Sequence, residues 1–258
     1  MPAPRNRFKQ ALNEGTTVFG CWLGLADTFS AELMGTTGFD WLVIDGEHAP
    51  NDLRSITAQL QVLEASQSHP VVRVPVGETY LIKQILDAGA QTILVPMVDN
   101  ADQARQLVRD VTYPPSGDRG VGYALTRAAR FSQIADYGTT ADAEICLLVQ
   151  VESLRGLENL DDILAIDGID GVFIGPADLA ADMGHMGDLL HADVQHAIMV
   201  ALKKIAAAGK APGILSTHDP MTEDAINAGA RFVAVGADSL ILSHAAQALA
   251  AKWKAPKA

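Results

Sequence analysis

The sequence lacks the features that mark several classes of protein. It has no apolar run near the roughly 18 residues of a membrane-spanning helix, and no apolar segment follows the charged N-terminus as in a signal peptide. Cysteine is scarce: Cys21 and Cys146 lie in apolar runs, so we expect two free, buried thiols in a reducing compartment. These features predict a soluble, cytoplasmic protein without a membrane partner.

Positive charge is also in short supply. The chain has 19 Lys and Arg against 31 Asp and Glu, a net charge of −12 at pH 7. This balance argues against nucleic acid or an anionic membrane surface as a partner. The same background would repel a small anionic substrate. A local cation, either an arginine or a metal ion, must then hold such a substrate.

Short apolar runs alternate with longer helical patterns along the whole chain. Several runs are continuously apolar, as parallel strands are when both of their faces are buried. Eight such units in 258 residues predict an α/β fold, a single (β/α)₈ TIM barrel spanning residues 1–258. The runner-up is an open doubly wound sheet, but no Gly-x-Gly-x-x-Gly motif opens a first helix. The expected strands are Val18–Leu25, Trp41–Asp45, Val71–Pro75, Thr92–Val98, Glu144–Glu152, Gly171–Ile174, Ala211–Ser216 and Phe232–Gly236.

The expected helices fill most of the segments between these strands. One long stretch, from about Tyr113 to Asp142, has no regular pattern. Long loops in compact barrels are often functional, and this one follows the fourth strand, so we expect it over the carboxyl face. The expected helices include Asn51–Ala65, Thr79–Ala88, Ala101–Val111, His191–Ala208 and Pro220–Ala228.

The carboxyl ends of the strands surround the active site in this fold. That rule selects candidate residues from their positions in the strands alone. It gathers carboxylates, one histidine and one arginine around an apolar mouth. The selected residues are Trp22, Asp45, Glu47, His48, Arg73, Gln150, Glu152, Gly175, Pro176, Ala177, Asp178 and Leu215.

Glu152 and Asp178 are the candidate metal ligands. They end neighbouring strands, and carboxylates are hard donors suited to Mg²⁺ or Mn²⁺. Two protein ligands leave about four positions of an octahedron for water and a chelating 2-oxoacid. The alternative is that either carboxylate caps a helix or forms a salt bridge at a strand end.

Arg73 and His48 are the candidate groups for acting on a substrate. Arg73 is charged inside an apolar strand, so it needs an anionic partner. It could pair with a barrel carboxylate such as Glu152, or donate to an enolate oxygen. His48 follows Asp45 by three residues, close enough for that carboxylate to fix the imidazole tautomer. An ordinary surface histidine is the alternative.

The Gly175-Pro176-Ala177-Asp178 turn precedes a short helical stretch. The free N–H groups of Ala177 and Asp178 could bind a carboxylate there. A plain strand-to-helix turn is the alternative interpretation.

Other reaction chemistries lack their residues. There is no Gly-x-Ser-x-Gly, Cys-x-x-Cys or His-Glu-x-x-His motif, and His191 and His196 do not have helical metal-binding spacing. A Schiff-base aldolase needs a lysine that reaches the barrel interior. We expect every lysine in a helix, turn or tail: Lys9, Lys83, Lys203, Lys204, Lys210, Lys252, Lys254 and Lys257.

Taken together, several segments resemble the HpcH/HpaI family of class II pyruvate aldolases. The resemblance runs in the same order from about residue 7 to 250, and the combination of segments is specific where any one would be weak. The segments are similar to those of the 4-hydroxy-2-oxoheptanedioate and 2-keto-3-deoxy sugar-acid aldolases of this family. The segments are Phe39-Asp-Trp-Leu-Val-Ile-Asp-Gly-Glu-His48, Val72-Arg-Val-Pro75, Leu94-Val-Pro-Met97, Tyr113-Pro-Pro-x-Gly-x-Arg-Gly-Val-Gly122, Gln150-Val-Glu152 and Phe173-Ile-Gly-Pro-Ala-Asp-Leu179.

The resemblance implies a reversible aldol addition of a pyruvate enolate to an aldehyde. It implies that Glu152 and Asp178 hold Mg²⁺, Mn²⁺ or Co²⁺, and that Arg73 contacts the bound pyruvate. His48 would be the acid/base with Asp45 beside it. Gln150 is a further pocket residue implied by the resemblance, with the amides of Ala177 and Asp178 holding the carboxylate. From their places at the strand ends, Trp22, Leu215, Gly175 and Pro176 are also expected to line the substrate pocket.

The resemblance also implies a homohexamer. Its C-terminal helix, Ser239–Trp253 here, would be exchanged between paired subunits, and Asp87 would reach a neighbour's histidine. Tyr123 departs from the smaller residue of close relatives, which leaves the aldehyde open. Two other functions stay open: a lyase acting on an acyl-CoA thioester, for which Arg127 and Arg130 are the clustered basic pair, and a non-catalytic barrel that binds small anions.

Overall fold

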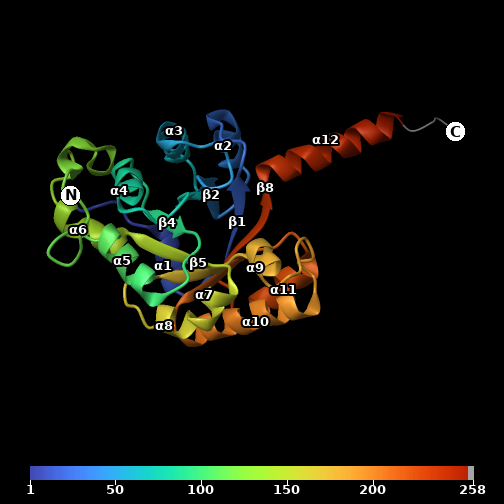
Figure 1. Ribbon diagram of the computed structural model, residues 1–258. Coiled ribbons are helices and arrows are strands. Elements are labelled where there is room, and N and C mark those ends of the chain that lie inside the picture. Colours follow the sequence, from blue (N-terminus) through green and yellow to red (C-terminus); the bar gives the residue numbers. More distant parts are fainter. Residues whose placement is uncertain (255–258) are drawn as a thin grey trace.

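The eight strands close into one parallel barrel, as predicted (Figure 1). The computed structural model describes residues 1–254. Each strand pairs with the next in chain order, and β8 closes onto β1. The strands are β1 (Val18–Leu23), β2 (Trp41–Asp45), β3 (His69–Arg73), β4 (Thr92–Val95), β5 (Cys146–Val151), β6 (Gly171–Ile174), β7 (Ala211–Leu215) and β8 (Phe232–Ala237).

Helices cover the outside of this barrel. The five expected helices form, and α3 begins with a reciprocal capping box between Asp52 and Ser55. No helix within residues 1–254 is long and apolar enough to cross a membrane. The helices are α1 (Arg7–Asn13), α2 (Thr28–Met34), α3 (Leu53–Leu63), α4 (Thr79–Asp87), α5 (Ala101–Val111), α6 (Tyr137–Glu144), α7 (Leu154–Glu158), α8 (Leu160–Leu164), α9 (Pro176–Asp182), α10 (Ala192–Ala207), α11 (Asp219–Asn227) and α12 (Asp238–Lys254), with short 3₁₀ turns η1 (Tyr123–Leu125) and η2 (Arg127–Ala129).

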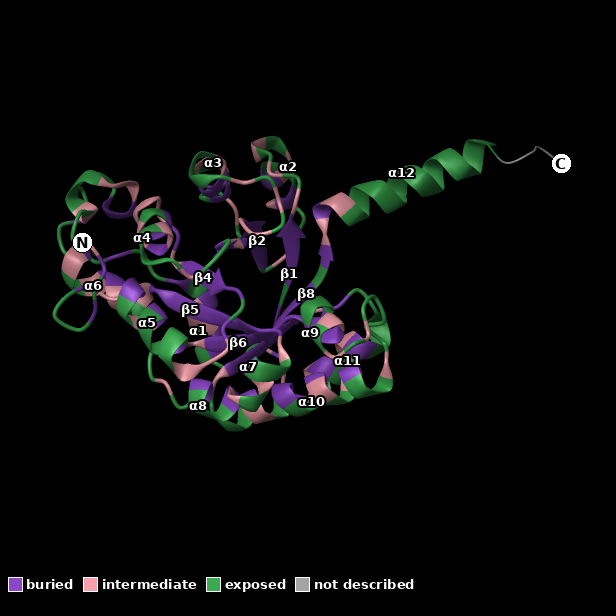
Figure 2. Cartoon of the chain, in the orientation of Figure 1, coloured by how far each residue is buried: buried purple, intermediate pink, exposed green. Residues whose placement is uncertain are grey.

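Two apolar cores follow from the alternation of side chains along each strand. Trp41, Val43 and Val71 belong to the core inside the barrel, whereas Leu42 and Val72 belong to the core between strands and helices. Figure 2 shows the strands buried and the outer helix faces exposed. The cysteines are both free and buried, as expected. Successive side chains of a strand therefore point alternately into the barrel interior and toward the helices.

The segment Tyr113–Asp142 lies at the opposite end of the barrel from the one we expected. Helix α5 returns the chain to the amino face, and Figure 1 shows α6 beside the N-terminus. The N–H of Ala3 donates to Thr140 Oγ1 at 2.8 Å. The prediction of a loop over the mouth was wrong. The segment does not follow β4 directly, because α5 comes between them and runs back to the amino face. The last six residues of that region form α6 together with Ala143 and Glu144, and Glu144 had been expected in a strand.

Helix α12 leaves the barrel and extends away from it (Figure 1). Its first residue, Asp238, is buried and accepts hydrogen bonds from the N–H groups of Gly24 at 2.8 Å and Leu25 at 3.3 Å. Along the helix, Leu249 is 59% exposed and Trp253 is 72% exposed. The chain thus carries an apolar helix that its own barrel does not cover. Exchange of this helix between subunits stays a prediction.

Candidate active site

A buried ion pair joins the ends of β2 and β3. Asp45 and Arg73 are register partners in the parallel pairing, so their side chains point to the same side, toward the barrel interior. The guanidinium donates from Nε to Asp45 Oδ1 at 2.8 Å and from Nη2 to Oδ2 at 2.7 Å. Its Nη1 lies 2.8 Å from Glu47 Oε2. Arg73 therefore faces the mouth. Its carboxylate partners are Asp45 and Glu47, not Glu152, which the sequence had suggested as a possible partner.

The two carboxylates around Arg73 differ in their acidity. Burial would raise the pKa of Asp45, but the hydrogen bonds and charge of Arg73 outweigh it and lower that pKa below its ordinary value. For Glu47 burial dominates, and its pKa is raised despite the charge of Arg73. Asp45 is therefore the firmly ionised member of the group, while Glu47 is the more readily protonated one.

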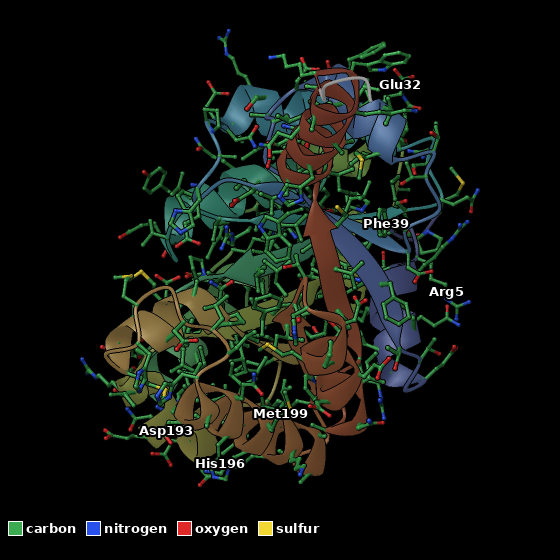
Figure 3. All side chains as sticks on the ribbon, turned by 90° about the vertical axis from the view of Figure 1, so that its right-hand side faces the viewer. Arg5, Glu32, Phe39, Asp193, His196 and Met199 are labelled. Atoms are coloured by element: carbon green, nitrogen blue, oxygen red, sulfur yellow. The ribbon has the colours of Figure 1, made fainter. Side chains whose placement is uncertain are left out.

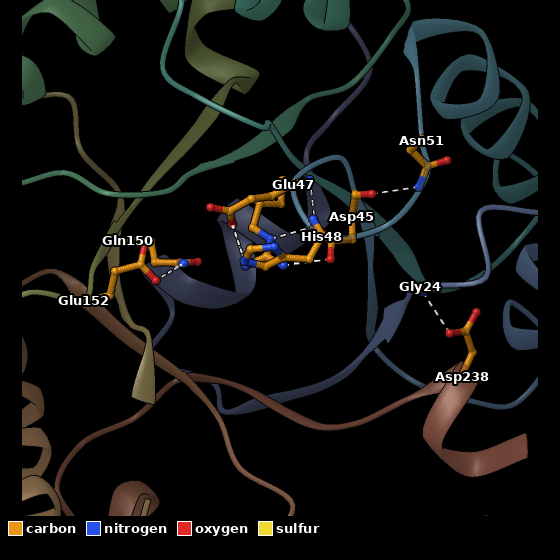
Figure 4. A network of polar contacts seen from close by, with 9 residues as sticks. Gly24, Asp45, Glu47, His48, Asn51, Gln150, Glu152 and Asp238 are labelled. Atoms are coloured by element: carbon orange, nitrogen blue, oxygen red, sulfur yellow. Dashed lines mark hydrogen bonds and ion pairs between the residues drawn. The ribbon is translucent and has the colours of Figure 1, made fainter. Parts of the chain in front are cut away.

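His48 lies at the rim of this group, with its side chain 67% exposed (Figure 4). The expected contact between its imidazole and Asp45 does not form, because Arg73 occupies that carboxylate. Asp45 Oδ1 instead accepts from the backbone N–H of His48 at 3.3 Å. The imidazole Nε2 lies 3.9 Å from Glu47 Oε2. Glu47, which we had noted without a role, is thus the residue that joins His48 to Arg73.

Glu152 is held from two sides at the end of β5. Its Oε1 accepts from the N–H of Met97 at 2.9 Å. Its Oε2 accepts from Gln150 Nε2 at 2.5 Å, the contact drawn in Figure 4. Burial raises the pKa of Glu152 to about 7; these two donors act against the rise, and the charges of Glu47 and Asp178 add to it. Glu47, Glu152 and Asp178 therefore share one region of negative charge.

The β6–α9 junction places Asp178 next to that region. Gly175 lies against the Glu152 side chain so closely that a Cβ there would collide with the carboxylate. Pro176 begins α9, and Gly175 offers no side-chain cap. The N–H groups of Ala177 and Asp178, in the first turn, therefore remain free of intrahelical partners. The predicted turn is therefore shorter than expected: Gly175 precedes the helix, and Pro176, Ala177 and Asp178 form the first turn of α9.

Aromatic and apolar side chains form the wall of the mouth. Trp22 is buried, its ring lies 5.3 Å from the Arg73 guanidinium carbon, and its centroid is 5.5 Å from that of Phe173. Leu215 is half-buried against the same inner core. The Arg73 guanidinium therefore lies against an apolar wall that includes Trp22 and Phe173.

Comparison with known proteins decides the family. The model of the HpcH/HpaI aldolase/citrate lyase family matches residues 18–245. The chain belongs to this family.

Its relatives match over nearly their whole length. A hydroxypyruvate/pyruvate aldolase of Roseobacter denitrificans is 59% identical, covering 98% of this chain and 99% of the relative. A 4-hydroxy-2-oxo-heptane-1,7-dioate aldolase of Salmonella dublin is 52% identical, covering 98% and 96%. A solved HpcH/HpaI aldolase/citrate lyase family protein from Burkholderia cenocepacia aligns with a TM-score of 0.90 at 42% identity, covering 95% and 98%. The predicted family is confirmed.

Asp87 is the one family-based site residue that lies apart from the mouth. It sits at the end of α4, where its Oδ1 lies 3.5 Å from Nη2 of the buried Arg119. Burial raises the pKa of Asp87, and Arg119 opposes that rise. The single HpcH/HpaI chain does not bring Asp87 near His48, so a role in catalysis would need a neighbouring subunit.

The basic pair considered for coenzyme A also lies elsewhere. Arg127 Nη2 contacts Glu64 at 2.6 Å and Arg130 Nη2 contacts the same residue at 3.2 Å, at the amino face of the barrel. Both guanidiniums are therefore paired and distant from the strand ends. This placement removes the observation that favoured an acyl-CoA lyase over an HpcH/HpaI aldolase.

The lysines lie outside the barrel mouth throughout residues 1–254. Six are on α1, α4, α10 and α12, and Lys257 lies outside the described residues. Lys210 precedes β7 at the amino face, where its Nζ donates to the carbonyls of Ile166 and Ile169 at 2.9 Å. Schiff-base chemistry therefore lacks its amine in the part of the chain that the structure describes.

A separate cluster of potential ligands lies between α9 and α10. His185, His191 and Asp193 have ligand atoms within 4.8 Å of one another, and Figure 3 shows Asp193 at the periphery. The two imidazoles are stacked, with centroids 3.5 Å apart and planes 17° from parallel. Lone pairs in two nearly parallel planes cannot point at one ion, so we assign no metal to this cluster.

Proposed function

We propose that this chain catalyses the reversible, divalent-metal-dependent aldol addition of pyruvate, or a related 2-oxoacid, to an aldehyde, giving a 4-hydroxy-2-oxoacid. The observation that carries the proposal is the buried Glu152 carboxylate, which lies close to Asp178 and to Glu47, the carboxylate that contacts Arg73. Family membership supports the same reaction class, and the names of the relatives support pyruvate and hydroxypyruvate as donors.

The donor set fits a hard divalent cation. Glu152 and Asp178 would hold it, as Mg²⁺, Mn²⁺ or Co²⁺. Gln150 Oε1 is buried without a hydrogen-bond partner within residues 1–254, which leaves one further oxygen free beside Glu152. When bound, the cation would act as a Lewis acid that makes the C3 protons of a chelated 2-oxoacid removable and stabilises the enolate.

The remaining roles belong to residues of this chain. Arg73, held in place by Asp45 and Glu47, would donate to the ketone oxygen of the 2-oxoacid as negative charge develops there. The N–H groups of Ala177 and Asp178 would bind the acid's carboxylate at the start of α9. Trp22 and Leu215 would exclude water from the reacting carbons.

His48 would handle the proton at the C4 oxygen. In the addition direction its imidazole would protonate the new alkoxide, and in cleavage it would accept the proton of the C4 hydroxyl. Its exposed position suits an incoming aldehyde. Glu47 would orient the imidazole from 3.9 Å.

The test measures two reactions of chelator-treated protein, with and without added Mn²⁺. An aldehyde panel with pyruvate reports carbon–carbon bond formation, and exchange of the pyruvate C3 protons reports enolisation alone. Both should require the cation. His48→Ala should lose bond formation and keep most of the exchange, while His196→Ala, on the outer surface, should keep both.

Three outcomes would contradict the proposal. Full activity in the chelated protein would exclude a metal-dependent aldolase. Borohydride trapping of the substrate would indicate a Schiff base. Binding of pyruvate without any exchange would favour the passive anion-binding barrel.

The proposal extends to assembly and location. We propose that the whole chain, residues 1–258, acts as one barrel domain within a homohexamer, with α12 exchanged between paired subunits and Asp87 reaching a neighbour's site. The uncovered apolar side chains of α12 support the exchange. The two free thiols favour a reducing compartment such as the cytoplasm.

A further inference from the structure

A strained backbone conformation lies directly beside the Glu152 carboxylate. Met97, between β4 and α5, has a φ of +56°, in the left-handed region where the Cβ of an L-residue crowds its own carbonyl oxygen. The residue is 65% exposed, so burial of the methionine does not compensate for this conformation. Strained backbone conformations of this kind cluster at functional sites, which points to a functional role for the backbone at Met97.

The conformation directs two successive N–H groups onto the end of β5. The N–H of Met97 donates to Glu152 Oε1 at 2.9 Å, and the N–H of Val98 donates to the carbonyl of Gln150 at 2.9 Å. Pro96, just before, has no N–H to offer. The left-handed turn at Met97 therefore brings an amide to the carboxylate while the next residue stays attached to the strand.

The following residues prevent the strain from relaxing. Asp99 Oδ1 accepts from Ser153 Oγ at 2.5 Å, and the carbonyl of Asp99 accepts from Asn159 Nδ2 at 2.8 Å. With Val98 and Asp99 both fixed to the β5–α7 region, Met97 is the residue that absorbs the turn. The loop is built around this one conformation.

We propose that Met97 is a positioning residue: its left-handed backbone fixes the orientation of the Glu152 carboxylate for cation binding. The N–H of Met97 donates to Oε1 of Glu152, and Nε2 of Gln150 donates to Oε2, so each carboxylate oxygen accepts from one donor. A carboxylate accepts about four hydrogen bonds, so lone pairs remain for a cation. The inference rests on the proposed function, in which Glu152 is a metal ligand.

The test is a substitution series at position 97, read as the dissociation constant for Mn²⁺ by calorimetry on chelator-treated protein. Met97→Gly and Met97→Asn tolerate the left-handed region and keep the N–H, so they should bind Mn²⁺ within about twofold of the unaltered chain. Met97→Val disfavours that region and should weaken binding about tenfold or more. Leu125→Val, at the exposed end of the 3₁₀ turn η1, is the matched control.

Thermal unfolding of the metal-free variants shows whether each one folds. If Met97→Val does not fold, replacing the amide at position 97 by an ester removes the N–H and keeps the side chain; it should weaken Mn²⁺ binding to a similar degree. A folded Met97→Val, or an ester variant, with unchanged Mn²⁺ affinity overturns the inference. Unchanged affinity in Glu152→Gln would instead overturn the proposed metal site, so the two failures are distinguishable.

Discussion

Arg73 makes three contacts with two carboxylates, and its planar guanidinium is what permits them. Lysine has a single ammonium group and cannot bridge Asp45 and Glu47 in this way. We expect Arg73→Lys to lower kcat/KM by about 10²–10³-fold, because the donor would no longer be aimed at the developing oxyanion. Arg105→Lys, on the exposed face of α5, should leave kcat/KM unchanged. Full activity in Arg73→Lys would refute the donor role.

Glu152 should make the stability of the metal-free protein depend on pH. Its folded pKa of about 7 lies above the ordinary 4.5, so between these values the folded state keeps a proton that the unfolded state has released. Stability should therefore fall as pH rises from about 4.5 to 7, by roughly 3 kcal/mol at most. Glu152→Gln should lose this dependence in denaturant titrations, and Glu32→Gln, on the surface, should keep it. Parallel profiles for all three proteins would contradict the assignment.

Side-chain alternation made much of the site predictable at this scale. Asp45, Arg73 and Gln150 occupy inward positions at the ends of apolar strands, so the strand-end rule finds them. Pairing was harder. Glu47 lies beyond its strand, and the amide of Met97 depends on a left-handed turn, and neither position follows from a period of two. The expected link between Asp45 and the imidazole failed because the nearer guanidinium competes for the same oxygens.

At the scale of elements, the β6–α9 junction requires glycine. A Cβ at Gly175 would collide with the Glu152 carboxylate, and the backbone of β6 leaves little room to move away, since the N–H of Gly175 bonds to Val151 at 3.1 Å. We expect Gly175→Ala to displace the carboxylate and weaken Mn²⁺ binding by at least about tenfold, a loss of roughly 1.4 kcal/mol.

Gly122→Ala is the matched control, because nothing lies within 4 Å of its added Cβ. Calorimetric titration of both variants with Mn²⁺ separates a local collision from a general effect of alanine. Equal affinities in the two variants would show that Glu152 does not need the space at Gly175.

Element type was easier to predict than element position. The strands and five helices followed from apolar periodicity, whereas Tyr113–Asp142 was assigned to the wrong face. Its irregular pattern hid the short helix α6, whose apolar residues Tyr137 and Ala141 pack with Ala3 near the N-terminus. Contacts with a segment more than a hundred residues away are not visible in local sequence.

At the scale of the whole molecule, α12 decides the expected assembly. Removing residues 240–258 keeps the Asp238 anchor and deletes the large exposed apolar residues of α12, from Leu240 to Trp253. We expect the truncated chain to have a lower native mass in light scattering, since the helix proposed to pack on a partner subunit would be absent. Gln247→Glu, a polar position on the same helix, should keep the native mass. An unchanged mass after truncation would exclude helix exchange as the basis of assembly.

The four carboxylates around the mouth affect the order in which the cation and the 2-oxoacid bind. Asp45, Glu47, Glu152 and Asp178 outnumber the guanidinium of Arg73, so a 2-oxoacid anion that arrives first meets a repelling field. A divalent cation reverses the local sign, and each ligand then strengthens the other's binding by the same factor. The metal-free protein would thus bind a 2-oxoacid weakly. The pyruvate concentration needed for half-saturation should therefore fall as the concentration of free divalent cation rises.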